Sequence, residues 1–197
     1  MGRAAAAGCV GRGRGGARVK PIISPNARIR HPEHFEIGEY SIVDDFCYIS
    51  TRVRIGVCSH VASGCSIAGG AARLFTLGDF SSLSSGVKIW CTSDDFANDI
   101  VCIMPAGIDV KSNLIEGDVT LGHYTAVGAN AVVMPGNHVP EGTVIGALSY
   151  VPASFQFEPW AVYAGVPVRR VGSRNRDAVT RQAALLRAHI QRGAVTS

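Results

Sequence analysis

The chain has 197 residues, of which 47% are hydrophobic, only 7% are aromatic and 23 are glycine, a globular composition that excludes fibrous and fully disordered classes. The formal net charge is +4, but residues 1–20 hold five cations and no acid, so the remaining chain carries −1. This near-neutral body gives no support for nucleic-acid binding, and no apolar run is long enough to span a membrane.

The first segment, residues 1–20, is rich in Gly, Ala and Arg and cannot bury a core, so we expect a disordered basic tail. It lacks the apolar stretch of a signal peptide. The six cysteines form no C-x-x-C pair and no zinc-binding spacing. We therefore expect reduced thiols and a cytoplasmic protein.

Between residues 21 and 156, branched residues recur at every sixth position. They form three runs: Ile37, Val43, Ile49, Ile55, Val61 and Ile67; Leu77, Leu83 and Ile89; Ile115, Leu121, Val127, Val133, Val139, Ile145 and Val151. A small or modest residue, such as Cys47 or Cys65, stands two positions earlier in most hexads. Neither a helix nor a simple strand has a period of six. The pattern predicts stacked coils of three short strands, with the cysteines as interior fillers.

This repeat resembles that of the hexapeptide-repeat acyltransferases, whose fold is a left-handed parallel β-helix. The resemblance covers roughly residues 22–171. It implies an all-β triangular prism whose coils lie about 4.8 Å apart, with an extruded loop and a C-terminal α-helix.

Two insertions interrupt the hexads. The first adds four residues between Ile67 and Leu77, and the second, residues 91–113, begins with Asp94, Asp95 and Asp99. Because function on a solenoid gathers where the repeat is broken, we expect this acidic loop to contact a substrate. Asp95 and Asp99 are expected either to bind sugar hydroxyls or to pin the loop through its own backbone.

Residues 157–197 leave the repeat. The stretch "FEPWAVYAGVPVRRVG" resembles the closing segment of sugar-acting hexapeptide acyltransferases, which binds the adenine and phosphate end of coenzyme A. The resemblance implies that Pro167, Arg169 and Arg170 bind acetyl-CoA, and guanidinium forks suit its phosphates. The alternative is a surface arginine pair.

The last segment, residues 173–193, has apolar residues at helical spacing. We expect a helix that packs this stripe on the prism or on a neighbouring subunit. The stripe consists of Val179, Ala183, Leu186 and Ile190.

A narrower resemblance lies in "SHVASGCSIAGG" and "FTLGDFSSLSSGVKIWCTSDDF", which look like acetyltransferases of nucleotide-linked amino sugars. It implies acetyl-CoA as donor, no metal, and a homotrimer with sites between subunits. The backbone N–H of Ala129 carries over as the oxyanion donor, and Gly128 lets pantetheine approach. One coil further, Gly146 and Ala147 match the positions that bind the pantetheine amides.

The catalytic base departs from the family pattern. In related galactoside and maltose acetyltransferases a His follows the strand before the loop, and here "VKIWCTSDDF" places Asp94 at that position. A carboxylate can accept an ammonium proton or orient an amine, so the sequence favours N-acetylation of an amino sugar, with O-acetylation as the alternative. His60, predicted to face outward, is a second candidate base, and His123 is a candidate for the base or for acceptor binding.

Two other functions share the prism. The γ-class carbonic anhydrases need an H-x-x-x-x-H spacing, which the six histidines of this chain do not make, so we expect no metal site. A non-catalytic scaffold would also lack the family histidine. The long acidic loop and the segment for coenzyme A favour an enzyme.

Overall fold

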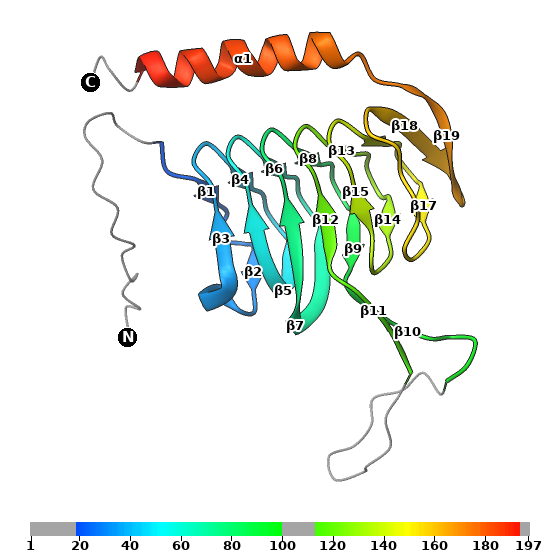
Figure 1. The fold of residues 1–197 in the computed structure, drawn as a ribbon. Coiled ribbons are helices and arrows are strands. Elements are labelled where there is room, and N and C mark those ends of the chain that lie inside the picture. The colour runs from blue at the N-terminus through cyan, green and yellow to red at the C-terminus, as the bar shows by residue number, and fades with distance from the viewer. Residues whose placement is uncertain (1–18, 100–112, 194–197) are drawn as a thin grey trace, which may run out of the picture.

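The structure is a computed structural model that describes residues 19–99 and 113–193. The chain forms a parallel β-solenoid of about six turns with one long helix along its side (Figure 1). This confirms the left-handed parallel β-helix predicted from the hexads. Of the expected tail only Val19 and Lys20 are described, and none of the helices within the described ranges is long and apolar enough to cross a membrane.

Each coil adds parallel strands to three faces, which we name A, B and C. Face A contains β1 (Ile22–Ile23), β4 (Ile42–Val43), β6 (His60–Val61), β8 (Ser82–Leu83), β13 (Ala126–Val127), β16 (Val144–Ile145) and β18 (Ala161–Gly165). Face B contains β2 (Arg28–Ile29), the first parts of β5 (Tyr48–Ile55) and β7 (Ser66–Leu77), β9 (Lys88–Trp90), β14 (Val132–Val133) and β17 (Tyr150–Val151). Face C contains β3 (Phe35–Ile37), the last parts of β5 and β7, β12 (Val119–Leu121) and β15 (His138–Val139).

The branched residues of successive hexads line up inside the prism. On face C, Ile55, Leu77, Leu121 and Val139 pair in register, and each is at most 4% exposed. Cys47 and Cys65 are buried fillers, as predicted. Ile115 is the exception, because the chain is still on the extruded loop there and its side chain is 37% exposed.

The small inward residues next to one corner form a ladder of hydroxyl groups. Ser59 Oγ donates to the Gly78 carbonyl at 2.8 Å and accepts from the Ser81 N–H at 3.2 Å. Ser81 Oγ repeats the pattern one coil further with the Gly122 carbonyl at 3.0 Å. Each hydroxyl thus satisfies backbone groups that the turn leaves unpaired inside the prism.

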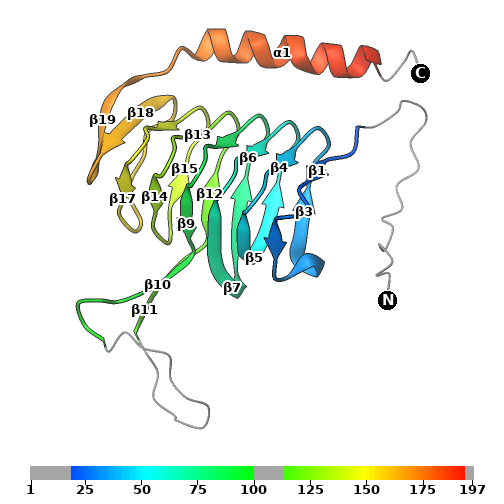
Figure 2. The same cartoon turned by 180° about the vertical axis from the view of Figure 1, so that it is seen from behind.

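The second insertion leaves the prism as an antiparallel hairpin of β10 (Thr92–Asp94) and β11 (Leu114–Glu116), which projects away from the coils (Figure 2). The first insertion holds its base. The Arg73 guanidinium donates to both carboxylate oxygens of Glu116, at 2.9 and 3.4 Å, which raises the pKa of Arg73. The Leu74 N–H donates to Asp118 Oδ1 at 2.9 Å. The two breaks in the repeat are therefore joined to each other.

The C-terminal segment turns back on the prism. In this segment, β19 (Val168–Ser173) pairs antiparallel with β18. A short 3-10 helix, η1 (Pro32–His34), lies in the first coil, near the other end of the chain. The helix α1 (Arg176–Gly193) follows β19, and Asn175 caps it by accepting from the Ala178 N–H at 3.0 Å. Figures 1 and 2 show α1 running back along the stack toward the first coils.

Aromatic and arginine side chains join α1 to the corner between faces C and A. The Arg187 guanidinium lies 4.6 Å from the ring centroid of Phe80 and 5.6 Å from that of Tyr124. Arg176 lies 5.5 Å from the Trp160 ring. Of the predicted apolar stripe, Ala183 is buried, and the other three residues line the two small cavities between α1 and this corner. The stripe therefore packs on the chain's own prism.

Candidate active site

A groove of about 430 Å³ opens on face B where the hairpin leaves the prism. Its lining residues are Trp90, Thr92, Ser93, Asp94, Phe96, Met134 and Tyr150. The hexad pattern places Trp90, Met134 and Tyr150 here, because each adjoins an inward branched residue in one of three successive coils. A groove of this size with an apolar floor and few polar groups suits a small organic ligand.

Asp94 is the predicted site residue that the groove contains. It ends β10, pairs with Leu114 across the hairpin, and is partly exposed toward the groove. The sequence prediction missed the aromatic and methionine walls. The signal that could have indicated them was the large residues Trp90, Met134 and Tyr150 beside inward branched positions of successive coils.

Asp95 and Asp99 hold the hairpin's own turn. Asp95 accepts from the backbone N–H groups of Ala97 and Asn98, at 3.0 and 3.2 Å, and from the Asn98 side-chain amide at 2.8 Å. The Asn98 amide and these N–H groups lower the pKa of Asp95. Asp99 accepts from the Asn113 N–H. Of the two roles predicted for these residues, these contacts are those of loop pinning, and residues 100–112 of the loop lie outside the described residues.

The two candidate histidines lie away from the groove within one chain. His60 is on face A, where its Nε2 is 2.8 Å from Asp44 Oδ2. His123 is at the corner between faces C and A, where its Nδ1 accepts from the Asp79 N–H at 2.9 Å. The chain therefore does not bring either histidine together with Asp94. Across the described ranges, no group of three or more His, Cys, Asp or Glu side chains is placed to hold a metal ion.

The corner between faces A and B carries two available backbone donors, one coil apart. Gly128 and Gly146 donate to the carbonyls of the next rung, each at 2.7 Å. Within the described part of the chain, the N–H groups of Ala129 and Ala147 have no recorded acceptor. Two such donors in line can bind successive carbonyl oxygens or a developing oxyanion.

The structure shows a reason for glycine at position 128 that differs from the predicted approach of pantetheine. A Cβ at this position would lie 2.3 Å from the backbone nitrogen of Ala147 in the next coil. Close stacking of the coils therefore requires this glycine, whether or not a ligand approaches it.

The predicted segment for coenzyme A forms the C-terminal end of the same stack. Pro167 lies in the turn between β18 and β19, and both arginines are exposed on β19. Arg170 contacts Glu158 at 3.5 Å and donates to Ser173 Oγ at 2.8 Å. Arg169 has no recorded ion pair or side-chain hydrogen bond within residues 19–99 and 113–193. One guanidinium is therefore available for an anionic ligand.

Comparisons with known proteins point to one group of enzymes. The chain is 28% identical over 164 residues, 82% of each chain, to a dTDP-4-amino-4,6-dideoxy-D-glucose acyltransferase of Escherichia coli. It is 31% identical to AntD, an N-acyltransferase from Bacillus cereus solved with dTDP and 3-hydroxybutyryl-CoA, with a TM-score of 0.75 over 85% of this chain and 88% of that one. A maltose O-acetyltransferase from Clostridium difficile 630 shares the fold at 19% identity, 73% and 72% coverage and a TM-score of 0.58. No protein-family model matches the chain.

Proposed function

The chain belongs to the hexapeptide-repeat acyltransferases that include the amino-sugar N-acyltransferases, and from this premise we propose that it acetylates the amine of a nucleotide-linked amino sugar with acetyl-CoA. The single observation that carries the assignment to an amine is the partly exposed carboxylate of Asp94 in the groove beside the hairpin. The relatives named for dTDP-linked amino sugars and for N-acyl transfer support it.

The chemistry is direct attack on the thioester. The amine nitrogen forms a bond to the carbonyl carbon, the carbon–sulfur bond breaks, and coenzyme A leaves as the thiolate. Asp94 takes the proton that the attacking nitrogen loses, or orients the amine for attack. The N–H of Ala129 stabilises the oxyanion, and that of Ala147 binds a pantetheine carbonyl. Arg169 and Arg170 contact the phosphates of the coenzyme.

We propose that the working unit is a homotrimer. In one chain the Ala129 donor lies at the corner between faces A and B, whereas Asp94 lies on the hairpin at the opposite edge of face B. The hairpin also points away from its own prism (Figure 1). A neighbouring chain placed against it would supply the missing half of the site. We also propose a cytoplasmic location, supported by the free thiols of Cys47, Cys65 and Cys91.

The proposed function is tested by product analysis. Purified protein and acetyl-CoA are incubated with a dTDP-linked 4-amino sugar and, separately, with the matching 4-hydroxy sugar. We expect an amide product from the first acceptor only. An ester product from the second acceptor, without amide formation, would establish O-acetylation instead, and no product with either would favour a scaffold.

The segment for coenzyme A is tested by the Arg169→Ala variant. Because loss of one charge-assisted contact to phosphate costs a few kcal/mol at most, we expect the Kd for acetyl-CoA to rise about tenfold in calorimetry. Arg54→Ala is the matched control, since Arg54 is an exposed arginine that pairs with Glu36 at 3.3 Å on face C. Equal affinity of the Arg169→Ala variant and this control would place the phosphates elsewhere.

A further inference from the structure

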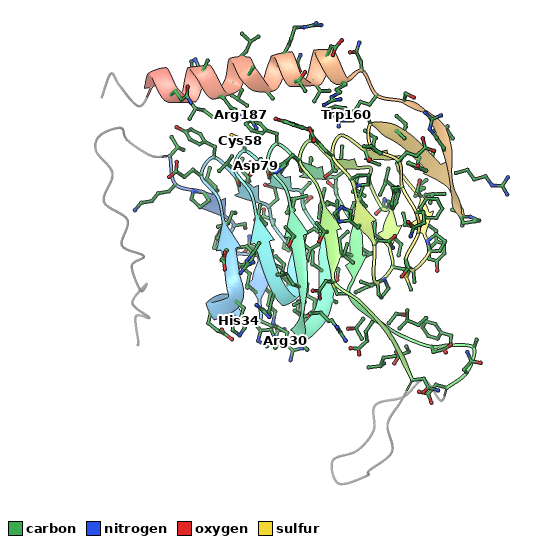
Figure 3. All side chains as sticks on the ribbon, viewed as in Figure 1. Arg30, His34, Cys58, Asp79, Trp160 and Arg187 are labelled. Atoms are coloured by element: carbon green, nitrogen blue, oxygen red, sulfur yellow. The ribbon has the colours of Figure 1, made fainter. Side chains whose placement is uncertain are left out.

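Face B carries positive charge on its strands, and the carboxylate of Asp94 lies on the hairpin at its edge. The strands of face B contain no Asp or Glu. Arg28 and Lys88 take outward positions on them, Arg30 follows β2 directly, and Arg52 stands at the corner where β5 passes to face C. We name these four residues the basic strip. The Lys88 amine donates to the Gly86 carbonyl at 2.6 Å. Figure 3 labels Arg30 at the same side of the prism from which the hairpin projects.

The basic strip differs from the three arginines of the chain that pair with glutamates. Arg54, Arg73 and Arg170 each have a glutamate partner within 3.5 Å. For the four residues of the strip, by contrast, no carboxylate lies within ion-pair distance in the ranges that the structure describes. Unpaired cations gathered on one face attract an anionic ligand.

Two guanidinium groups of the strip converge on one rung. Arg28 Cζ lies 5.8 Å from the ring centroid of Tyr48, and Arg30 Nη1 is 3.5 Å from the Tyr48 hydroxyl. Both arginines come from the first coil, so their side chains lean along the stack toward the second. A ring and a hydroxyl that hold two guanidinium groups side by side leave several N–H donors available to phosphate oxygens.

The spacing between this rung and the groove is compatible with a nucleotide sugar. Tyr48 pairs with Ser66, which pairs with Lys88 on the strand that also carries Trp90. Two rungs span about 10 Å along the axis. In a nucleotide sugar, the path from a 4-amine through the ring and the glycosidic oxygen to the second phosphorus crosses about eight bonds, roughly 10 Å when extended. An amine in the groove at the level of Trp90 would therefore place the diphosphate near the level of Tyr48.

We propose that the basic strip binds the diphosphate of the nucleotide-linked acceptor. This inference rests on the proposed function and adds to it the direction in which the acceptor lies. The donor occupies the C-terminal coils, between Ala129 and the β18–β19 turn, and the acceptor runs from the hairpin toward the first coil. Coenzyme A also contains a diphosphate, but Arg169 lies at the far end of the stack from Arg28 and Arg30 (Figure 1).

The test is a double variant, Arg28→Ala with Arg30→Ala, which changes exposed residues of the first coil only. In calorimetry we expect its Kd for dTDP to rise at least about tenfold, since two charge-assisted contacts are lost. In kinetics we expect the KM for a dTDP-linked 4-amino sugar to rise by a similar factor. The kcat/KM for the same amino sugar without its nucleotide and the Kd for acetyl-CoA are expected to stay unchanged. Arg54→Ala is again the control and is expected to match the wild type in all four measurements.

The separate measurements distinguish failure of this inference from failure of the proposed function. Unchanged affinity for dTDP in the double variant would overturn the inference, and so would a weakened affinity for acetyl-CoA, which would assign the strip to the coenzyme's diphosphate. Failure of the proposed function has a different signature, because the wild type itself would then acetylate no amino sugar. The dTDP titration reports on the strip in either case.

Discussion

Replacement of Asp94 by asparagine is expected to lower kcat/KM for an amino-sugar acceptor by roughly 100-fold at neutral pH, the lower range of general-base effects. Asparagine keeps the size of the side chain and its place at the end of β10 but cannot accept a proton. The measurement is steady-state kinetics with acetyl-CoA and a nucleotide-linked amino sugar. The Kd for acetyl-CoA should not change, because Asp94 lies in the groove on face B and not at the corner that carries the Ala129 and Ala147 N–H groups.

The pH dependence of this loss identifies what Asp94 does. As the pH rises, a larger share of the amine is already unprotonated in solution, so the deficit of the Asp94→Asn variant should shrink if the carboxylate removes a proton. A deficit that stays constant with pH would instead assign Asp94 to positioning of the amine. Asp95→Asn is the matched control, because its carboxylate is occupied by Ala97 and Asn98 in the hairpin turn. Full activity of the Asp94→Asn variant would contradict both roles.

Replacement of Gly78 by alanine is expected to lower the free energy of unfolding by about 3 kcal/mol and the Tm by roughly 10 °C. The added Cβ would lie 2.5 Å from the carbonyl carbon of Gly122 and 2.6 Å from the backbone nitrogen of His123. Backbone cannot move aside as a side chain can, so the two coils must separate locally. Denaturant and thermal unfolding followed by circular dichroism measure the effect.

Gly172→Ala is the control for this prediction. A Cβ at Gly172 meets only the Val162 side chain, at 4.0 Å, which is ordinary contact. Its Tm should equal that of the wild type. If the Gly78→Ala variant were as stable as the wild type, the backbone at this corner would not limit the spacing between the third and fourth coils.

The hexads predicted the interior of the fold well because a side-chain period fixes which residues face inward. Leu77, Leu121 and Val139 were assigned to one period and they share one column. The count failed at Ile115, where the period happens to continue through a hairpin arm that no longer belongs to a coil. The six-residue spacing shows which branched residues are in phase, but it does not show where the chain leaves the prism.

The candidate site was predicted less completely for a related reason. Asp94 and the Ala129 donor follow from local motifs, and both were named from the sequence. Trp90 and Met134 meet on one face only because the long insertion returns the chain to the same register, which the sequence between them does not specify. His60 was predicted to face outward, as it does, but the count did not show that its face differs from that of the groove.

The course of α1 has a consequence for how the stack comes apart. In an ordinary solenoid each coil touches only its neighbours, so either end can fray while the remainder persists. Here Arg176 contacts Trp160 in the last coil, while Ile190 and Gln191 line a cavity with Tyr40 in the second. The helix therefore connects the last coil to the second, so loosening of the first coils also removes contacts of the C-terminal part of α1. The last coil and the second coil are therefore coupled through α1, in addition to the contacts between neighbouring coils.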